Sequence, residues 1–141
     1  MDGRFRRYEI RILILVDSSV WIDYFNGVDI AETKTLDETL GVEPVAIGDL
    51  ILVEVLQGFK NDDEHETAKQ VFNDIAVFEL LGKDLAMKSA DNFRSLCKRG
   101  IAIRKTADVI IATFCIENKL PLLFSDKDFN PFVKHLGLQE V

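Results

Sequence analysis

The sequence lacks any apolar run long enough to cross a bilayer. A membrane-spanning helix needs about 20 consecutive apolar residues, whereas the longest run here, residues 12–16, has the length of a single strand. Basic residues precede that run, but its apolar part is short and ends in Asp17 instead of a small-residue cleavage site. We therefore expect neither a membrane span nor a signal peptide.

Cysteine and histidine are also scarce, with 2 residues of each. Cys97 and Cys115 do not form a Cys-x-x-Cys pair, and both histidines lie far from them, which argues against a zinc site and against a disulfide framework. A reducing cytoplasm is the expected setting, and we expect both cysteines to fill the core. Glycine-rich phosphate loops and Ser-His-Asp or Cys-His sets are absent as well, which argues against P-loop and nucleophilic chemistry.

The balance of charge is acidic, with 24 Asp and Glu against 17 Lys and Arg and a net charge of −7. Generic nucleic-acid binders carry a basic surface that displaces phosphate counterions. Acidic residues gathered around a divalent cation also make a chain acidic, and the bound metal then reverses the local sign. The position of the acids therefore matters more than their number.

The start of the chain departs from this acidic character, because residues 1–11 contain Arg4, Arg6, Arg7 and Arg11. We interpret this segment as a basic arm of a single domain that spans residues 1–141. The arm has three open interpretations: an ordered element, a contact to RNA or a remnant of cloning.

Two apolar patterns alternate along the rest of the sequence. Short β-branched and leucine-rich runs predict strands, and apolar residues at helical spacing predict helices between them. The predicted strands are 12–16, 44–47, 76–80 and 121–124, with an edge strand at 138–141, and the predicted helices are 18–27, 29–40, 48–58, 62–73, 83–98 and 106–118. We expect Ser18 and Ser19 to cap the first helix and Thr106 to cap the last one. This alternation predicts a three-layer α/β/α domain with a central, mainly parallel sheet of about five strands.

Acidic residues follow two of the predicted strands. Asp17 comes directly after residues 12–16, and Asp126 follows residues 121–124 with only Ser125 between them. Ligands of parallel α/β sheets bind outside the carboxyl ends of the strands. If these two strands are neighbours, the two carboxylates converge at one edge of the sheet.

Two further acids, Glu54 and Asp108, lie in helical segments that are otherwise apolar. A buried carboxylate is unfavourable by several kcal/mol unless it is paired or bound to a metal, and no basic partner is evident in the local sequence. Carboxylates and water are the ligands that Mg²⁺ and Mn²⁺ prefer. A site with one or two such ions would activate water for attack on a phosphodiester.

Four segments resemble the motifs of PIN-domain nucleases. They are LVDSSVWIDYF around Asp17, LILVEVLQG around Glu54, KTADVIIA around Asp108 and LLFSDKDF around Asp126, and together they span nearly the whole chain. The size of the chain and the pattern from Glu54 to Gly58 are most similar to the toxins of VapBC toxin–antitoxin modules. This resemblance implies an Mg²⁺-dependent endoribonuclease that a small cognate antitoxin neutralises and that commonly forms a homodimer.

The resemblance also implies roles for particular residues. Catalysis and metal binding fall to Asp17, Glu54, Asp108 and Asp126. Ser18 and Ser125 are candidate hydrogen-bond supports, and Asp128 is an accessory acid. The candidate contacts to RNA phosphates are the basic residues that flank the helix of Asp108, namely Lys98, Arg99, Arg104 and Lys105.

Other interpretations stay open at this point. The basic residues before Asp108 also fit an ordinary solvated face, and Glu54 also fits the partner of a buried arginine. Trp21, Tyr24 and Phe25 fit core and dimer packing better than base stacking. The alternative function is a catalytically silent PIN scaffold that binds a protein partner.

Overall fold

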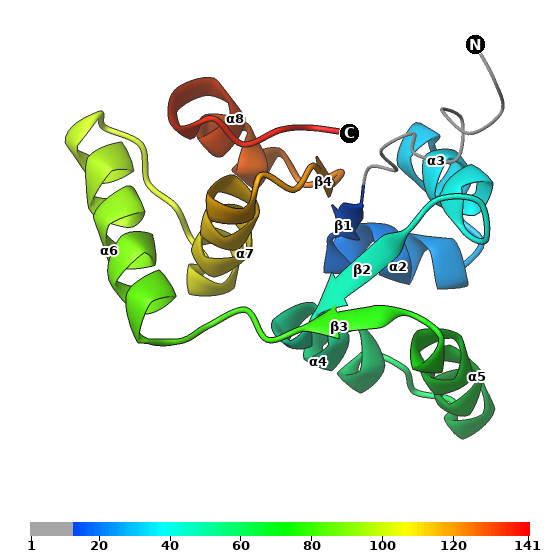
Figure 1. Ribbon diagram of the computed structural model, residues 1–141. Coiled ribbons are helices and arrows are strands. Elements are labelled where there is room, and N and C mark those ends of the chain that lie inside the picture. Colours follow the sequence, from blue (N-terminus) through cyan, green and yellow to red (C-terminus); the bar gives the residue numbers. More distant parts are fainter. Residues whose placement is uncertain (1–12) are drawn as a thin grey trace, which may run out of the picture.

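The computed structural model describes residues 13–141, and its centre is a parallel sheet with the strand order β3-β2-β1-β4 (Figure 1). The strands are β1 (Ile14–Val16), β2 (Val45–Gly48), β3 (Ala76–Phe78) and β4 (Leu122–Leu123). All three strand pairings are parallel. The predicted α/β class is confirmed, whereas the basic arm 1–11 lies outside the described residues.

The sheet of the described chain has four strands, where the sequence predicts about five. The segment 138–141 forms only an isolated bridge between Leu122 and Glu140. Leu122 donates a hydrogen bond to Gln139 O at 2.9 Å and accepts one from Val141 N at 3.1 Å. This single pair of hydrogen bonds anchors the segment but does not build a ladder.

Helices surround the sheet. They are α2 (Ser18–Phe25), α3 (Ala31–Thr39), α4 (Asp49–Gln57), α5 (Asp62–Asn73), α6 (Lys83–Lys98), α7 (Thr106–Asn118) and α8 (Asn130–Leu136), with a short 3₁₀ helix, η1 (Lys127–Phe129), before α8. In Figure 1, α6, α7 and α8 lie to the left of the sheet and α3 and α5 to the right. The bounds of α5 and α6 agree with the predicted segments because the amphipathic pattern of both is regular.

Burial explains why the central strands form where they do. Every residue of β1 and β2 is buried, as expected for parallel strands that are covered on both faces. Behind them, Trp21 is fully buried, and its ring centroid lies 4.9 Å from that of Phe72 in an edge-to-face contact. This aromatic packing orients α2, which begins directly after Asp17.

The sequence predicts that both cysteines fill the core, but the structure buries only one of them. Cys115 is buried on α7, whereas Cys97 is exposed, so its predicted core position is wrong. Cys97 is the penultimate residue of α6 and lies on its exposed side, whereas the preceding Leu96 is fully buried. No helix among the described residues combines the length and apolar character that crossing a bilayer requires.

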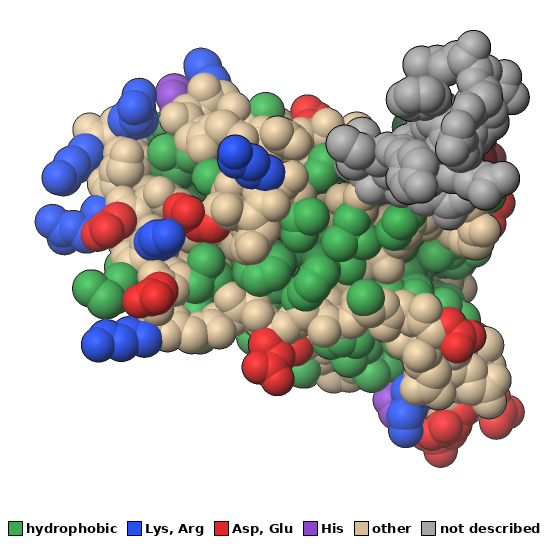
Figure 2. Space-filling model, viewed as in Figure 1, with side chains coloured by type: hydrophobic (Ala, Val, Ile, Leu, Met, Phe, Trp, Pro, Cys, Tyr) green, Lys and Arg blue, Asp and Glu red, His purple; other side chains and the backbone are tan. Residues whose placement is uncertain are grey.

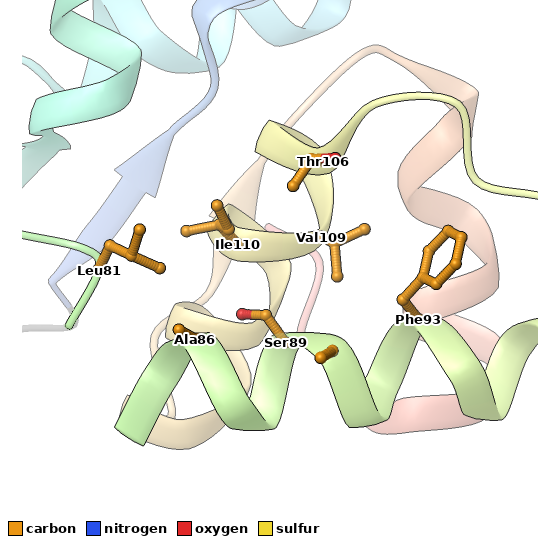
Figure 3. A pocket seen from close by; sticks show the side chains of 8 residues that line it. Leu81, Ala86, Ser89, Phe93, Thr106, Val109 and Ile110 are labelled. Atoms are coloured by element: carbon orange, nitrogen blue, oxygen red, sulfur yellow. The ribbon is translucent and has the colours of Figure 1, made fainter. Parts of the chain in front are cut away.

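A crevice of about 280 Å³ lies where α6 packs beside α7. Its walls are almost entirely apolar and come from Leu81, Ala86, Ser89, Ala90, Phe93, Thr106, Val109 and Ile110 (Figure 3). The Ser89 hydroxyl is buried and has no hydrogen-bond partner in the described chain. Among the described residues, no acidic or basic side chain lines this crevice, so its chemistry differs from that of the strand ends.

Candidate active site

Asp17 stands at the junction of β1 and α2. Its backbone is extended, and its side chain caps α2 by accepting a hydrogen bond from Ser19 N at 3.4 Å. The residue is 3% exposed, and Oδ1 has no hydrogen-bond partner within residues 13–141. Burial raises the pKa of Asp17, hydrogen bonds from Ser19 and from the Ser18 backbone oppose the shift, and the charge of Asp126 adds to it.

Asp126 reaches the same place from the other side of β1. Because β4 pairs with β1 in parallel, with Val16 opposite Leu123, the two strands end at one edge of the sheet. Asp126 is extended and caps η1 by accepting a hydrogen bond from Asp128 N at 2.9 Å. The sheet register therefore brings two acids together that are far apart in the sequence.

Glu54 and Asp108 approach this edge from α4 and α7. Asp108 is 5% exposed, and its Oδ2 is buried without a hydrogen-bond partner in the described structure. Burial, the charge of Asp17 and the charge of Asp126 raise its pKa to about 7. Glu54 is half-buried, its Oε1 is likewise without a partner, and burial followed by the charge of Asp17 raises its pKa.

These four carboxylates form one electrostatic unit. Asp17 acts on Glu54 and on Asp108, and Asp126 acts on Asp17 and on Asp108. Among residues 13–141, no arginine or lysine forms a salt bridge with any of them, so the interpretation of Glu54 as the partner of a buried arginine has no support there. Buried carboxylate oxygens without donors or counter-ions are the ligand set that a hard divalent cation satisfies.

The serines around Asp17 are arranged differently from the prediction. Ser19, not Ser18, donates its hydroxyl hydrogen to Asp17 Oδ2, at 2.9 Å, and Ser19 Oγ lies 3.3 Å from Ser125 Oγ. Asp17 itself is the N-cap of α2, so the predicted cap at Ser18 and Ser19 is wrong. The signal was available, because an N-cap side chain reaches the second or third helical residue, and Ser19 is the second.

The predicted cap of α7 needs the same correction. Lys105 precedes the helix as its N-cap, without a side-chain hydrogen bond, and Thr106 is the first helical residue. The charge of Lys105 lowers the pKa of Glu54 and of Asp108, which places this lysine beside the acids.

The other basic residues occupy different surroundings. Arg104 forms a salt bridge with Asp128, with Nη2 3.0 Å from Oδ2. Arg99 Nη1 instead lies 3.5 Å from His135 Nδ1, and Lys98 is the exposed last residue of α6. Neither Lys98 nor Arg99 contacts the four carboxylates in the described part of the chain.

Asp128 joins the edge of the acidic group. One carboxylate oxygen each from Asp108, Asp126 and Asp128 lie within 4.8 Å of one another. This spacing allows the three side chains to share one cation.

A parallel sheet with carboxylates converging at the carboxyl ends of neighbouring strands defines a class of α/β domains suited to binding divalent metal ions. The sequence model of one family of this class, the PIN domain, matches residues 14–133. The chain belongs to the PIN domain family.

Proteins named as VapC ribonucleases are similar to this chain over most of their length. Ribonuclease VapC1 of Methanocaldococcus jannaschii is 30% identical over 126 residues, which cover 89% of this chain and 85% of the relative. VapC ribonuclease Mb1587 of Mycobacterium bovis is 24% identical over 129 residues, which cover 90% of this chain and 96% of the relative.

Solved structures share the fold. VapBC2 of Rickettsia felis, bound to a DNA fragment from its promoter, aligns with a TM-score of 0.73 at 13% identity and covers 92% of this chain and 98% of that one. VapBC-1 of nontypeable Haemophilus influenzae aligns with a TM-score of 0.70 at 15% identity and covers 92% and 97%.

Proposed function

We propose that this protein is a metal-dependent endoribonuclease and the toxin of a type II toxin–antitoxin pair, with Asp17, Glu54, Asp108 and Asp126 binding Mg²⁺ or Mn²⁺. The observation that carries the proposal is the set of buried oxygens on Asp17, Glu54 and Asp108 that have no partner among residues 13–141. The names of the similar proteins, which are ribonucleases, support the substrate class.

The protein's own groups prepare the site for a cation. Ser19 and the backbone of α2 hold Asp17 in one orientation, and Asp126 is held by the turn that leads into η1. Burial and the charges of Asp17 and Asp126 raise the pKa of Asp108 to about 7, so a cation that binds near neutral pH would displace a proton from its carboxyl. A bound Mg²⁺ supplies the Lewis acidity for water-mediated cleavage of a phosphodiester bond.

Substrate binding needs positive charge at the rim of this acidic site. Lys105 is exposed and close enough to act on Glu54 and Asp108, so we assign it a contact to the RNA phosphate. In the view of Figure 2, most basic side chains lie on the side of α6 and α8, with acidic side chains among them.

The carboxylate replacements Asp17→Asn and Asp108→Asn test the proposal directly. Each is expected to abolish Mg²⁺-dependent cleavage of single-stranded RNA, because each removes a metal ligand at nearly constant volume. Asp91→Asn on the exposed face of α6 is the matched control, since it makes the same charge change away from the acids. Undiminished cleavage by both site variants, with the control active, would remove the assignment.

The proposed partner is a small VapB-type antitoxin. The solved structures similar to this chain include VapBC complexes, and a basic antitoxin side chain brought to the carboxylates would replace the metal electrostatically. The test is coexpression with the product of the adjacent reading frame, which should copurify with this chain and suppress RNA cleavage.

We also propose a homodimer in the cytoplasm. Large apolar side chains are exposed on α4 and α6 and between β3 and α6, including Val53 at 57%, Met87 at 61% and Leu81 at 50%. Contact with a second copy would remove this surface from water. Light scattering after gel filtration should report a dimer, and Met87→Glu should shift it to a monomer.

A further inference from the structure

The carboxylate of Asp128 lies between a cation of the protein and the acidic group. On one side, Arg104 Nη2 lies 3.0 Å from Oδ2 and 3.3 Å from Oδ1. On the other side, one Asp128 oxygen lies within 4.8 Å of oxygens of Asp108 and Asp126. The same side chain can therefore serve a guanidinium or a divalent cation.

The residues around Asp128 favour binding of its carboxylate to a divalent cation when one is present. Asp126 Oδ1 accepts a hydrogen bond from Asp128 N, so both acids are held on one turn. Asp108 is the third candidate ligand, and its Oδ2 is buried with no hydrogen-bond partner within residues 13–141. A divalent cation would satisfy this oxygen and would draw the three carboxylates closer than their mutual repulsion otherwise permits.

The ion pair that would be given up is a weak one. The side chain of Arg104 is 78% exposed, whereas that of Asp128 is 24% exposed. Solvent screens an exposed guanidinium, so its attraction for a carboxylate is small compared with that of a coordinated divalent ion. Arg104 loses little on release because water already surrounds most of it.

Arg104 lies close enough to the acidic site to contact a bound RNA once Asp128 no longer holds it. It lies two residues before α7, next to Lys105, whose charge acts on Glu54 and Asp108. This segment therefore borders the acidic site. A free arginine there presents a planar fork that matches phosphate oxygens.

We propose that Arg104 and a divalent cation compete for the Asp128 carboxylate, and that cation binding frees Arg104 to contact an RNA phosphate beside the site. This inference rests on the proposed function and adds a coupling to it. The metal-free protein keeps Arg104 folded against Asp128, and the loaded protein turns it toward the substrate.

Mn²⁺ binding to the whole protein tests the competition without any activity measurement. Titration followed by the electron paramagnetic resonance signal of free Mn²⁺ should show that Arg104→Gln binds the ion about three- to fivefold more tightly than the unchanged protein, the range that an exposed ion pair supplies. Arg94→Gln is the matched control, because it removes an exposed arginine on α6 outside this contact. The proposal is overturned if both variants gain the same affinity for Mn²⁺, or if Arg104→Gln gains no affinity.

RNA binding in EDTA tests the release. Asp128→Asn should bind a fluorescently labelled single-stranded oligoribonucleotide about threefold more tightly, because Arg104 is then free without a cation. The double variant Asp128→Asn with Arg104→Gln should lose that gain, whereas Asp91→Asn should show only the smaller effect of one lost negative charge. An equal gain in the single and double variants overturns the role of Arg104.

The outcomes separate this inference from the function on which it rests. RNA cleavage by the unchanged protein together with unaltered Mn²⁺ affinity in Arg104→Gln rejects the competition alone. Competition for Mn²⁺ without any RNA cleavage rejects the nuclease alone. An unchanged protein that does not bind Mn²⁺ rejects both.

Discussion

Ser19 Oγ donates a hydrogen bond to Asp17 Oδ2 at 2.9 Å and lies 3.3 Å from Ser125 Oγ. Because a serine hydroxyl has a single hydrogen, Ser125 is the donor in the contact between the two serines. The end of β4 thus supports Ser19, and Ser19 in turn supports the first acid of the site. This chain of hydroxyls orients a carboxylate whose burial would otherwise favour its protonated form.

Removal of that support should weaken cation binding. Ser19→Ala is expected to reduce the affinity for Mn²⁺ about tenfold, because a hydrogen bond to a charged group contributes about 1.5 kcal/mol or more. Ser18→Ala keeps the backbone N–H that faces Asp17, so its affinity for Mn²⁺ should fall much less. Isothermal titration at neutral pH measures both, and equal losses in the two variants would contradict the role of the Ser19 hydroxyl.

The stability of the metal-free protein should depend on pH through Asp108. Its pKa is raised from 3.8 to about 7, so the folded state binds this proton more tightly than the unfolded chain. The resulting stability is fully present below about pH 4 and is lost as the pH rises through about 7, a loss on the order of 4 kcal/mol. Urea unfolding in EDTA across this range should show the decline, and Asp108→Asn should flatten it.

The matched control for this pH dependence is Asp91→Asn, which should keep the full slope because Asp91 is exposed on α6. Saturating Mg²⁺ should also remove the slope, since a bound cation keeps Asp108 ionised throughout. A slope that persists in Asp108→Asn would assign the titration to another group.

Glu54→Gln should separate stability from metal binding. The variant removes a partly buried charge and its repulsion with Asp17, and it should therefore stabilise the metal-free protein. Mg²⁺ at 100 times its dissociation constant stabilises a binding protein by about 2.7 kcal/mol, and the variant should lose most of this gain. Thermal unfolding with and without Mg²⁺ measures both effects, with the exposed Glu79→Gln as control; an Mg²⁺ shift equal to that of the unchanged protein would exclude Glu54 as a ligand.

The crevice between α6 and α7 offers a test of packing that leaves the acids untouched. Ser89→Ala removes a buried hydroxyl that has no hydrogen-bond partner in the described chain and should raise the free energy of unfolding by about 0.5 to 1 kcal/mol. Thr113→Val on the facing helix removes the acceptor of Asn92 Nδ2, at 3.0 Å, and should lower it by about 1 kcal/mol. Chemical denaturation measures both, and destabilisation by Ser89→Ala would indicate a partner for its hydroxyl.

Much of the fold could be predicted from local patterns. The helix Lys83–Lys98 has the predicted bounds because its apolar residues recur at helical spacing, and β1 is buried throughout as its continuous apolar run predicts. The acids Asp17 and Asp126 could be singled out because a carboxylate at or just beyond the end of a buried strand is a local feature. Their roles as metal ligands stay predictions.

Only the tertiary structure determined which residues distant in the sequence contact one another. The contact of Ser19 with Ser125 and the ion pair of Arg104 with Asp128 join segments that are distant in the sequence, as does the clustering that raises the pKa of Asp108. Residue identity alone determined which chemical groups were available and which helix or strand carried each of them. Their distances, their burial and the choice among neighbouring serines and arginines depend on strand order and helix packing, because only the folded chain brings those groups within the few ångströms over which hydrogen bonds and unscreened charges act.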